Sequence, residues 1–499
     1  MSAKRVLIIA TVDSGGGAGI TADCLTVHDM GAFPLPCTVA VTAQSLKRVA
    51  AVESLSSDMT KTALNLALHD WPEKPSAVKV GFIPSDKVLK EVLTFLETEL
   101  QGVPVIWDPV LTATAGRMDS ADLKAVLPRL LKVTEIFTPN LPEALELMDF
   151  SREDLEREGI ETLGRRFIAL GAKAVMIKGG HVEGRDECTD VLITAEKTLT
   201  FSYRKKAGEG AHGGGCALSS ALAALRAQGY ALEDAAVLAK AYVTEGIFKP
   251  EGIDSHERPP LGHHGFPRTL DCMPAVGDFT FPRPRREAFP PCPLNMGLYP
   301  VVGDVDTLEW LLAMGVRTAQ LRIKDKLDPQ LSDKIKRAVF LGRSYHARVF
   351  IDDHYELAMR HHAYGVHLGM EDVREADLNA IAASGLRLGL STHGMCELLQ
   401  ALSLRPSYVA LGHIFETQTK KMKSPAQGVR RLKYEVELIA GRVPTVAIAG
   451  IKLDNLDGVL QSGVGSVAVV TAITKAPDPY AACQEWLRRV GNGGDEDVR

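Results

Sequence analysis

The chain has 499 residues, more than one ordinary domain needs and enough for two domains with separate cores. Hydrophobic residues make up 45% of it, charged residues 24%, and the net charge is -5, which describes a soluble globular protein and excludes a basic nucleic-acid-binding surface. No apolar run approaches the roughly 20 residues of a membrane-spanning helix. The eight cysteines are scattered without paired spacing. We therefore expect a cytoplasmic protein with no membrane or nucleic-acid partner.

Five β-branched runs precede residue 250 and alternate with helical patterns. They lie at residues 6–9, 38–41, 77–80, 103–107 and 174–177. Strands joined by helices usually pair in parallel, so the pattern predicts an α/β domain over residues 1–250 whose mostly parallel sheet is covered by helices. The first run ends at Asp13 in a glycine loop, which indicates a first strand rather than a signal peptide.

Polar residues follow the first two runs. The segment DSGGGAGITAD places a glycine loop before a helix that carries Asp23, and the segment AVTAQS ends in a strand with Gln44. A carboxylate beside an amide suits an aminopyrimidine, which offers donors and acceptors on one edge. From these residues alone, Gln44 as a substrate contact and Gln44 as a satisfied strand-end residue both stay open.

Three further strand ends carry candidates for a Mg²⁺–nucleotide site. Asp108 follows the run VIW, Asn140 and Glu143 open the next helix, and Lys178 stands in the glycine turn IKGGH. Carboxylates suit Mg²⁺, and a lysine beside glycines suits a phosphate. Helix capping by Asp108 and Glu143 is the alternative.

The segment GGGC, with Gly213, Gly214, Gly215 and Cys216, leads straight into an apolar helix. Bare backbone N–H groups at a helix N-terminus form an anion hole, which would stabilise a phosphoryl group in transfer. The helix dipole predicts a lowered pKa for the Cys216 thiol and hence a usable base. The alternative is a buried cysteine at a helix start after a flexible turn.

Residues 5–247 resemble the hydroxymethylpyrimidine/phosphomethylpyrimidine kinases of the ribokinase-like fold through DSGGGAGITAD, AVTAQS, AVKVG, DPV, TPNLPEA, IKGGH and GGGCALSSALAA. The resemblance implies phosphorylation of a pyrimidine alcohol and then of its monophosphate with ATP and Mg²⁺. It also implies roles for the residues above: Asp23 and Gln44 on substrate, Asp108 and Glu143 on metal, Asn140, Lys178 and Gly214 on nucleotide, and Gly213, Gly215 and Cys216 in catalysis.

This half departs from the kinase pattern at several phosphate contacts. The departures are Thr114, Ala115, Gly210, Ala211, Gly214 and Ala217, where the family carries polar side chains. A non-catalytic pyrimidine-binding or regulatory module is therefore the alternative to an active kinase. A pyridoxal-type kinase is disfavoured, because most vitamin and sugar kinases of the fold carry Asp at the position of Cys216.

Between residues 251 and 294 the helix and strand periods vanish and prolines crowd in, which predicts a linker. A metal site at its histidines, His256, His263 and His264, is disfavoured because partners at ligand spacing are missing. We expect these histidines to be solvated.

Residues 295–499 contain eight short apolar runs, each followed by a helical stretch. The runs lie at 298–301, 318–321, 348–351, 365–367, 386–390, 408–411, 445–448 and 466–470. Eight such units predict a TIM (β/α)8 barrel, whose chemistry sits at the carboxyl ends of the strands.

Unusual polar residues follow these runs in order. They are Gln320, Arg322 and Lys324; Asp352 and Asp353; His367, Glu371 and Asp372; Ser391 and His393; Thr417, Thr419 and Lys420; Gly450; and Thr471. Cations on one strand end beside carboxylates on the next two suit Mg²⁺ that bridges a pyrophosphate, and the small residues after the last strands suit a phosphate.

Residues 297–484 resemble thiamin-phosphate synthase through QLRIK, FIDDH, YGVHLGMED, LGLSTH, ALGHIFETQTK, PTVAIAGI and GVGSVAVVTAI. The resemblance implies that the diphosphate of 4-amino-5-hydroxymethyl-2-methylpyrimidine loses pyrophosphate and that thiazole phosphate captures the pyrimidine cation. The diphosphate is the product of the kinase family, so the two resemblances fit one reaction sequence.

The same resemblance distributes the barrel residues by role. It implies Arg322, Lys324 and Lys420 on the departing charge, Asp353 and Asp372 on Mg²⁺, and Gln320, Asp352, Ser391, Thr417, Thr419, Gly450, Val470 and Thr471 on the substrates. For His367, a structural role and a substrate contact both stay open.

Three barrel residues depart from the family pattern: Asp352 replaces Asn, Ala449 replaces Gly and Thr471 replaces Ser. An extra carboxylate at Asp352 would weaken the pyrophosphate contact unless it faces the metal or stays protonated. We expect small-molecule partners and a homo-oligomer.

Overall fold

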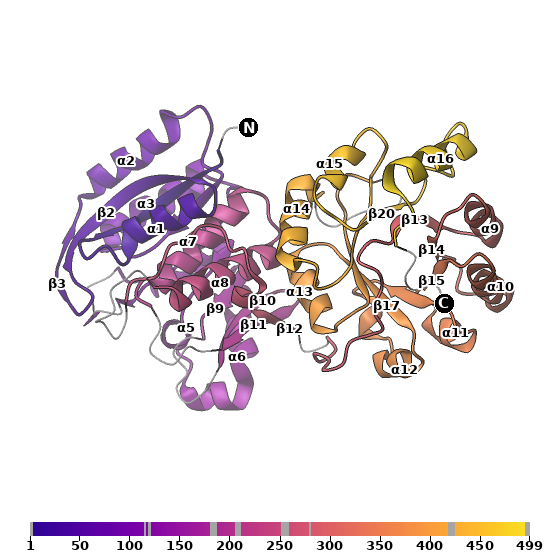
Figure 1. Cartoon of the computed structure of the whole chain (residues 1–499). Helices are drawn as coiled ribbons and strands as arrows, with labels where there is room; N and C mark the ends of the chain where they lie inside the picture. Colours follow the sequence, from indigo (N-terminus) through magenta and orange to yellow (C-terminus); the bar gives the residue numbers. More distant parts are fainter. Residues whose placement is uncertain are drawn as a thin grey trace. The chain divides into compact units, whose positions relative to one another are not determined.

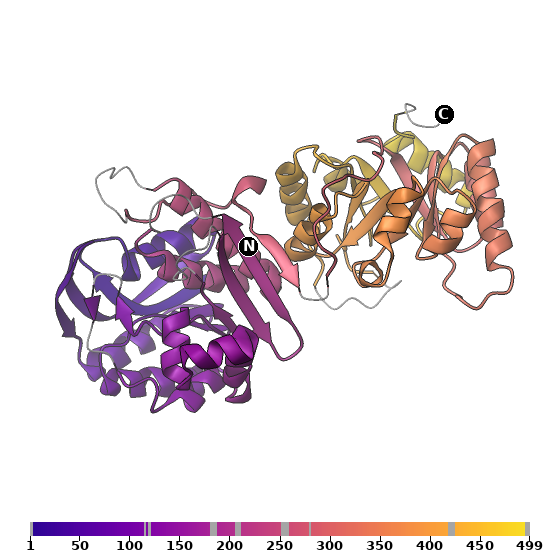
Figure 2. The ribbon, with the colours of Figure 1, turned by 90° about the horizontal axis from the view of Figure 1, so that it is seen from below.

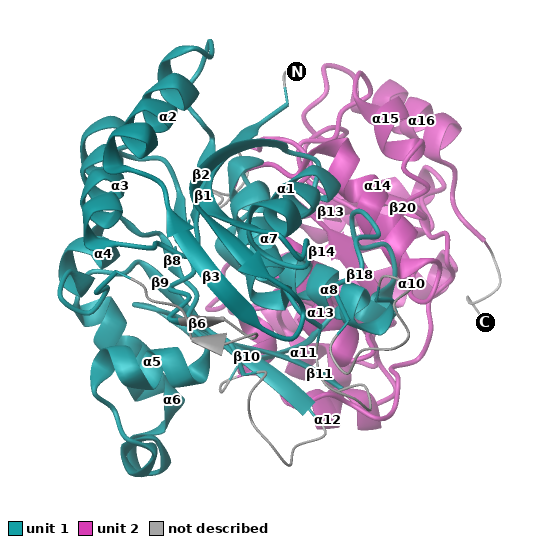
Figure 3. Cartoon of the chain, turned by 90° about the vertical axis from the view of Figure 1, so that its left-hand side faces the viewer, with its two compact units in different colours: residues 1–279 teal, residues 280–499 magenta. Residues whose placement is uncertain are grey.

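The computed structural model describes residues 3–113, 116–117, 121–179, 187–204, 211–250, 259–278, 281–417 and 425–494. The chain divides into two compact units, residues 1–279 (unit 1) and residues 280–499 (unit 2) (Figure 3). No helix among the described residues is long and apolar enough to cross a membrane.

Unit 1 is built on a ten-stranded sheet, with the strand order β12-β11-β10-β9-β8-β5-β4-β1-β2-β3. The strands are β1 (Arg5–Asp13), β2 (Phe33–Gln44), β3 (Val49–Ser54), β4 (Ala77–Val80), β5 (Val105–Trp107), β8 (Ile136–Phe137), β9 (Ala174–Ile177), β10 (Glu187–Thr194), β11 (Thr198–Arg204) and β12 (Ala275–Asp278). The central strands from β2 to β9 pair in parallel, and the strands at both edges pair antiparallel. This confirms the predicted α/β class. A separate two-stranded ribbon joins β6 (Thr112–Ala113) to β7 (Gly116–Arg117).

Helices cover both faces of this sheet. They are α1 (Gly19–Asp29), α2 (Ser57–His69), α3 (Asp86–Glu99), α4 (Leu127–Val133), α5 (Leu141–Met148), α6 (Arg152–Ala169), α7 (Gly214–Ala227) and α8 (Leu232–Phe248), with the short 3-10 helix η1 (Leu270–Cys272). Apolar residues of α2 to α6 form one core with side chains such as Val80, Trp107 and Phe137, while α7 packs on α1, α8 and the strands from the opposite face (Figure 3). Since successive strand residues face opposite sides, Lys79 lies on the face of α1 and α7.

The described part of the predicted linker belongs to the two units. Strand β12 pairs antiparallel with β11 at the sheet edge (Figure 2), and the linker residue His263 hydrogen-bonds through Nδ1 to the Tyr242 hydroxyl at 2.6 Å. On the other side, Phe289 donates its N–H to the Arg405 carbonyl at 3.0 Å within unit 2. A proline-rich segment can still add an edge strand and cover apolar surface, which its composition did not reveal.

The histidines of this segment form no metal site among the residues that the structure covers, which contain no group of three His, Cys, Asp or Glu residues suited to an ion. His264 bonds to the Lys249 carbonyl at 2.5 Å, so it and His263 are engaged rather than simply solvated. His256 lies outside the described residues.

Unit 2 is a closed barrel of eight parallel strands, which confirms the predicted TIM barrel (Figure 1). The strands are β13 (Gly297–Val302), β14 (Thr318–Leu321), β15 (Arg348–Asp352), β16 (Gly365–Leu368), β17 (Arg387–Thr392), β18 (Tyr408–Leu411), β19 (Thr445–Ala447) and β20 (Ser466–Val469). The helices around it are α9 (Val305–Ala313), α10 (Leu331–Ser344), α11 (Tyr355–Arg360), α12 (Leu378–Ala383), α13 (Met395–Ser403), α14 (Gly428–Ile439), α15 (Leu456–Leu460) and α16 (Pro479–Val490), with the 3-10 helix η2 (Asp372–Arg374).

The amino-terminal end of the barrel is closed by a buried cation. Arg348, at the start of β15, is 1% exposed and donates hydrogen bonds to the Thr318 hydroxyl at 2.9 Å and to the carbonyls of Gly494 at 2.8 Å and Asn492 at 3.1 Å. The segment after α16 is thereby held across the end of the barrel opposite the strand carboxyl ends. Two backbone hydrogen bonds, from Leu298 to the Gly491 carbonyl at 2.9 Å and from Gly494 to the Asn295 carbonyl at 3.1 Å, hold the same segment, and Arg348 adds a charged donor shared among neutral acceptors.

We therefore expect Arg348→Met to lower the free energy of unfolding of unit 2 by about 2–4 kcal/mol, because three acceptors lose a charged donor. Urea unfolding of the full chain, followed by circular dichroism, measures this. The matched control is Arg343→Met, whose exposed guanidinium bonds, within the described part of the chain, to the His362 carbonyl. Equal stability of the two variants would contradict the assigned role.

Candidate active sites

The amino-terminus of α7 lies against the glycine loop that follows β1. Gly213 is the N-cap residue with φ 86°, and a Cβ there would lie 2.0 Å from the Gly17 carbonyl oxygen. Only glycine allows this approach, since the conformation and the missing space both exclude a side chain. The predicted glycine-rich helix start is therefore present, with its backbone N–H groups beside the first strand end.

Asp13 and His212 connect the glycine loop after β1 to the segment that leads into α7. The Asp13 carboxylate accepts from the N–H groups of Gly15 at 2.8 Å and Ala18 at 3.0 Å, and His212 Nε2 lies 3.4 Å from it. Burial raises the Asp13 pKa, but the His212 contact and the two N–H groups outweigh burial and lower it. Asp13 begins the predicted glycine loop, but its contact with His212, 199 positions away, has no local signal in the sequence.

Asp23 is fully buried and forms an ion pair with Lys79 at 2.6 Å. Its second oxygen accepts from the Ser220 hydroxyl of α7 at 2.7 Å. Burial nevertheless raises the Asp23 pKa, while Lys79 lowers it. Gln44 bonds instead within its own strand, where its Oε1 accepts from the Thr42 hydroxyl at 3.4 Å. Asp23 and Gln44 thus engage different partners among the described residues.

A second buried pair lies at the ends of β5 and β9. Lys178 Nζ donates to Asp108 Oδ1 at 2.7 Å, and the other Asp108 oxygen meets the Ser219 hydroxyl at 3.5 Å. Glu143 accepts the Asn140 N–H at 2.8 Å and forms a capping box with it, so the capping alternative holds for Glu143. Burial raises the Glu143 pKa, Lys178 lowers it, and Asp108 raises it further.

The donor set around Asp108 fits Mg²⁺. Among the described residues, one Asp108 oxygen has only the long contact to Ser219, and each Glu143 oxygen has one backbone donor and spare lone pairs. Magnesium usually takes one or two carboxylates and completes its shell with water and substrate phosphates.

Cys216 is partly exposed in the first turn of α7. Burial raises the pKa of its thiol to about 11, Lys79 lowers it, and the carboxylates of Asp23 and Asp108 raise it. The prediction of a lowered pKa was therefore wrong in direction. Lys79 and the backbone N–H of Gly19 favour the thiolate, but loss of water and two nearby carboxylates outweigh them.

A third buried lysine–aspartate pair was missed by sequence reasoning. Asp190 of β10 pairs with Lys240 of α8 at 2.5 Å, and its other oxygen accepts the N–H of Gly179 at 2.9 Å. Lys240 also lies 4.4 Å from the centre of the Tyr203 ring. Because Gly179 follows Lys178 directly, this pair fixes the turn that aims Lys178 at Asp108. No local sequence signal identifies it.

The departures from the kinase pattern divide between described and undescribed residues. Thr114, Ala115 and Gly210 lie outside the described residues, whereas Ala211, Gly214 and Ala217 are described. Ala217 is fully buried and, as an alanine, offers no hydroxyl.

In unit 2, Asp352 holds two of the predicted ligand residues. Gln320 Nε2 donates to Asp352 Oδ1 at 2.5 Å, and Arg322 Nε donates to Oδ2 at 2.9 Å. Burial and the neighbouring Asp353 raise the Asp352 pKa to about 7, against the lowering effect of Arg322. Asp352 therefore faces Gln320 and Arg322.

Asp353 and Asp372 follow the adjacent strands β15 and β16, and the charge of Asp372 affects the pKa of Asp353. Burial and the charge of Asp372 raise the Asp353 pKa, while Arg322 lowers it. Two carboxylates that repel each other near the barrel mouth fit a divalent cation. Lys324 is exposed beyond the end of β14, and among the described residues it forms no ion pair.

His367 lies inside the barrel and is 6% exposed. Its two ring nitrogens bond to the hydroxyls of Tyr408 and Ser391, each at 2.7 Å. Burial lowers its pKa to about 3, so the imidazole is neutral. His367 thus contacts a predicted substrate ligand, Ser391, through a hydrogen bond.

The predicted phosphate loops follow β19 and β20. Gly450 has φ 68° and a Cβ there would lie 2.7 Å from the Glu416 carbonyl oxygen, so glycine is required. Ala449 before it has φ 79°, a conformation in which the family glycine is unstrained and alanine is not. Val470 and Thr471 begin the turn after β20.

The loop after β18 is described up to Thr417 and again from residue 425. Thr419 and Lys420 therefore lie outside the described residues.

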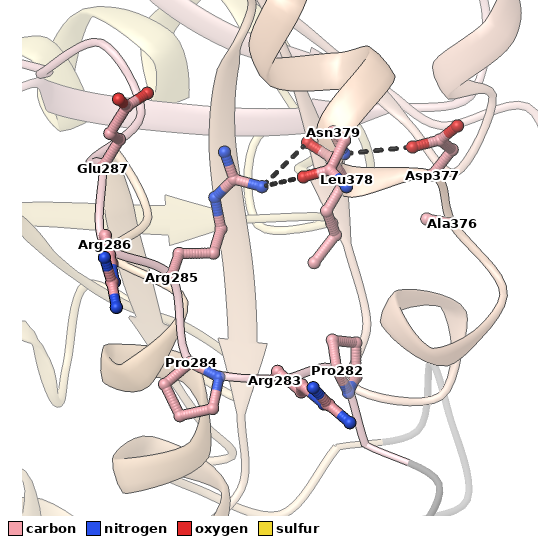
Figure 4. Close-up of a pocket in the computed structure, with 10 residues that line it drawn as sticks. All are labelled: Pro282, Arg283, Pro284, Arg285, Arg286, Glu287, Ala376, Asp377, Leu378 and Asn379. Carbon is pink, nitrogen blue, oxygen red and sulfur yellow. Dashed lines mark hydrogen bonds between the residues drawn. The ribbon is translucent and has the colours of Figure 1, made fainter.

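A surface hollow of about 500 Å³ lies elsewhere on unit 2, between residues 282–287 and the start of α12 (Figure 4). Arg285 crosses it and donates to Asn379 Oδ1 at 2.8 Å. None of the predicted site residues lines it.

Comparison with known proteins assigns both units. A phosphomethylpyrimidine kinase family model matches residues 13–260, and a thiamine monophosphate synthase family model matches residues 298–473. The thiamine-phosphate synthase of Klebsiella pneumoniae subsp. pneumoniae is 54% identical over 208 residues, which are 42% of this chain and 98% of that protein.

Solved structures resemble unit 1. A phosphomethylpyrimidine kinase from Clostridium difficile 630 is 31% identical with a TM-score of 0.42, and covers 49% of this chain and 99% of its own. The pyridoxal kinase from Staphylococcus aureus in complex with pyridoxal is 24% identical with a TM-score of 0.48, and covers 56% of this chain and 98% of its own.

Both resemblances inferred from the sequence are confirmed by the two family models. The chain therefore belongs to the thiamine-phosphate synthase family through unit 2 and carries a phosphomethylpyrimidine kinase domain in unit 1.

Proposed function

We propose that the chain makes thiamin phosphate in two stages, one on each unit. Unit 1 phosphorylates hydroxymethylpyrimidine and then its monophosphate with ATP, and unit 2 joins the resulting diphosphate to thiazole phosphate with release of pyrophosphate. The observation that carries this proposal is the presence of both family domains on one chain, because the product of the first is the substrate of the second.

In unit 1, the substrate oxygen attacks the γ-phosphorus of ATP, its proton passes to a base, and ADP leaves. We assign the base to Cys216 and the stabilisation of the transferring phosphoryl group to the N–H groups of Gly213, Gly214 and Gly215. Lys178 and Asn140 bind nucleotide phosphates, and Asp23 and Gln44 act on the pyrimidine. Mg²⁺ held by Asp108 and Glu143 would supply charge neutralisation between the phosphates.

In unit 2, the bond between the pyrimidine methylene and the diphosphate oxygen breaks, and the thiazole nitrogen forms a bond to that carbon. Arg322 keeps its two terminal nitrogens for the departing anion because Asp352 takes only Nε. Lys324 and Lys420 add positive charge, Gln320 and Ser391 bind the pyrimidine diphosphate, and Thr417, Thr419, Gly450, Val470 and Thr471 hold the thiazole phosphate. Mg²⁺ on Asp353 and Asp372 would neutralise the pyrophosphate as it leaves.

The second candidate keeps the synthase and makes unit 1 a non-catalytic pyrimidine-binding module. The observation behind it is in the sequence, where Gly210, Ala211, Gly214 and Ala217 stand at positions that carry polar side chains in the kinase family. The two candidates differ in whether ATP is consumed. A homo-oligomer remains a prediction.

We expect thiamin phosphate from the purified chain given ATP, Mg²⁺, the pyrimidine alcohol and thiazole phosphate, and also from a parallel reaction given the pyrimidine diphosphate without ATP. Chromatographic detection of the product distinguishes the candidates. Product from the diphosphate alone would favour the binding module, and product from neither would contradict the synthase assignment as well.

The raised thiol pKa makes the kinase rate depend on pH. With a pKa of about 11, the thiolate fraction of Cys216 rises about tenfold per pH unit across the neutral range. We expect kcat/KM for the pyrimidine alcohol to rise steeply between about pH 7 and pH 9, and Cys216→Ala to lose both most activity and this slope.

Kinase turnover at a series of pH values tests this prediction, with synthase activity on the diphosphate as the internal control. Cys24→Ala is the matched variant, since Cys24 is a partly exposed cysteine of α1. The same slope in Cys216→Ala would exclude the thiol as the base.

Replacing Asp352 by Asn, the residue typical of the family, removes one negative charge from beside Arg322. At pH 8 we expect KM for the pyrimidine diphosphate to fall roughly threefold to tenfold, since a carboxylate near the site repels the substrate anion. Steady-state synthase kinetics measure it. A higher KM would instead mean that holding Gln320 and Arg322 in place outweighs the repulsion.

A further inference from the structure

A chain of four hydrogen-bonded side chains crosses the interior of the barrel. The Tyr299 hydroxyl of β13 bonds to the Tyr408 hydroxyl of β18 at 2.7 Å. Tyr408 bonds to His367 Nδ1 at 2.7 Å, and His367 Nε2 bonds to the Ser391 hydroxyl of β17 at 2.7 Å. We call these four residues the relay. It begins among buried aromatic rings and ends at Ser391 near the carboxyl end of its strand.

The barrel is shaped to let Tyr408 reach His367. Gly389 is the residue of β17 opposite His367, and a Cβ there would lie 2.4 Å from the Tyr408 hydroxyl oxygen. The missing side chain lets the tyrosine ring lie across β17 and stack on the imidazole, with ring centres 5.6 Å apart and an interplanar angle of 25°. A glycine, a tyrosine and a histidine from three consecutive strands therefore make one arrangement.

The hydrogen bonds of the relay can run in two directions, and we call this direction of donation its polarity. Only one polarity gives every donor of the relay an acceptor. Among the described residues, the Tyr299 hydroxyl has its hydrogen bond with Tyr408 alone, and it is 1% exposed. Its proton must therefore go to Tyr408, whose own proton must go to His367 Nδ1. A neutral imidazole that accepts at Nδ1 carries its proton on Nε2, which donates to Ser391.

The reverse polarity leaves a buried hydroxyl proton without an acceptor. If Ser391 donated to Nε2, then Nδ1 would donate to Tyr408, Tyr408 would donate to Tyr299, and the Tyr299 proton would have no acceptor. A charged imidazolium would have the same defect, because it would donate from both nitrogens. Buried groups without partners are disfavoured, so the polarity runs from Tyr299 to Ser391.

We propose that Tyr408 and His367 are positioning residues that keep the Ser391 hydroxyl a donor toward the barrel mouth. Ser391 already accepts from His367, so its own proton is directed to a lone pair of the bound ligand, a phosphate oxygen or a ring nitrogen. A ligand that offered only a donor at this point would have to use the second lone pair of Ser391 and would leave the Ser391 proton without an acceptor on the ligand, so an acceptor is preferred. The ligand side of this inference rests on the proposed synthase function, whereas the polarity of the relay does not.

The first test determines the polarity of the relay by spectroscopy and does not depend on synthase activity. The ¹⁵N spectrum of the full chain labelled at histidine reports the tautomer of each imidazole, and the difference from His367→Gln assigns His367. We expect the proton on Nε2 in the unaltered chain and a mixture of tautomers in Tyr408→Phe, where Nδ1 has lost its donor. A proton on Nδ1 in the unaltered chain would overturn the proposal.

The second test measures synthase kinetics with the pyrimidine diphosphate and thiazole phosphate. We expect Tyr408→Phe and Ser391→Ala each to lower kcat/KM by about tenfold or more, and the double variant to be no worse than Ser391→Ala. A structural defect would add to the loss from Ser391→Ala, so additive losses would overturn the proposal.

The matched control is Tyr364→Phe. Tyr364 packs edge-on against Phe350 of the same core at 5.3 Å but lies outside the relay, so kcat/KM should stay within about threefold of the unaltered chain. Melting curves of all variants confirm folding. If no variant and not even the unaltered chain makes product, the synthase assignment fails while the histidine spectrum still decides the relay.

Discussion

The strands that carry the site residues pair in parallel in both units, so the side chains that follow them lie together at the carboxyl ends of the strands. In unit 1, Asp13, Asp108 and Lys178 lie at these ends, and α7 places Cys216 there. In unit 2, Arg322, Asp353 and Asp372 lie at the corresponding ends. Residues separated by long stretches of sequence become neighbours because each βα connection returns the chain in the same direction.

Unit 1 has three buried lysine–aspartate pairs around the carboxyl ends of its strands. Lys79 with Asp23, Lys178 with Asp108 and Lys240 with Asp190 all have N–O distances of 2.7 Å or less. A buried charge is costly unless it is paired and hydrogen-bonded, and each aspartate also meets a hydroxyl or a backbone N–H. The same pairs determine the charge around Cys216, whose thiol is held protonated by burial and two of these aspartates.

Unit 2 uses few charges inside the barrel and many hydroxyls. Its interior is filled by Tyr299, Phe350 and Tyr408, with His367 neutral among them. Charged groups lie at the strand ends, where Asp352 accepts hydrogen bonds from both Gln320 and Arg322. Asp352, one of the three barrel positions at which this chain departs from its family, is thus bonded to two predicted ligand residues.

Local patterns in the sequence were sufficient for the architecture. Runs of β-branched residues alternating with helical stretches predicted both folds, and GGGC at residues 213–216 predicted a helix start with exposed N–H groups, because periodicity and glycine chemistry act within a few residues. The motif residues after each strand also indicated the site edges. Composition was a poorer guide to the proline-rich segment, most of whose described residues pack on one unit or the other.

Tertiary structure alone decided which charged groups meet and how strongly they are desolvated. His212 lies 199 positions from Asp13, and Lys240 lies 50 positions from Asp190, so no local pattern links them. The Cys216 pKa could not be read from its place at a helix start, because burial and the carboxylates of Asp23 and Asp108, from other elements, raise it. The sequence by itself determined the elements and the chemistry at their ends, whereas pairing, polarity and protonation arose only where distant faces came into contact and excluded water.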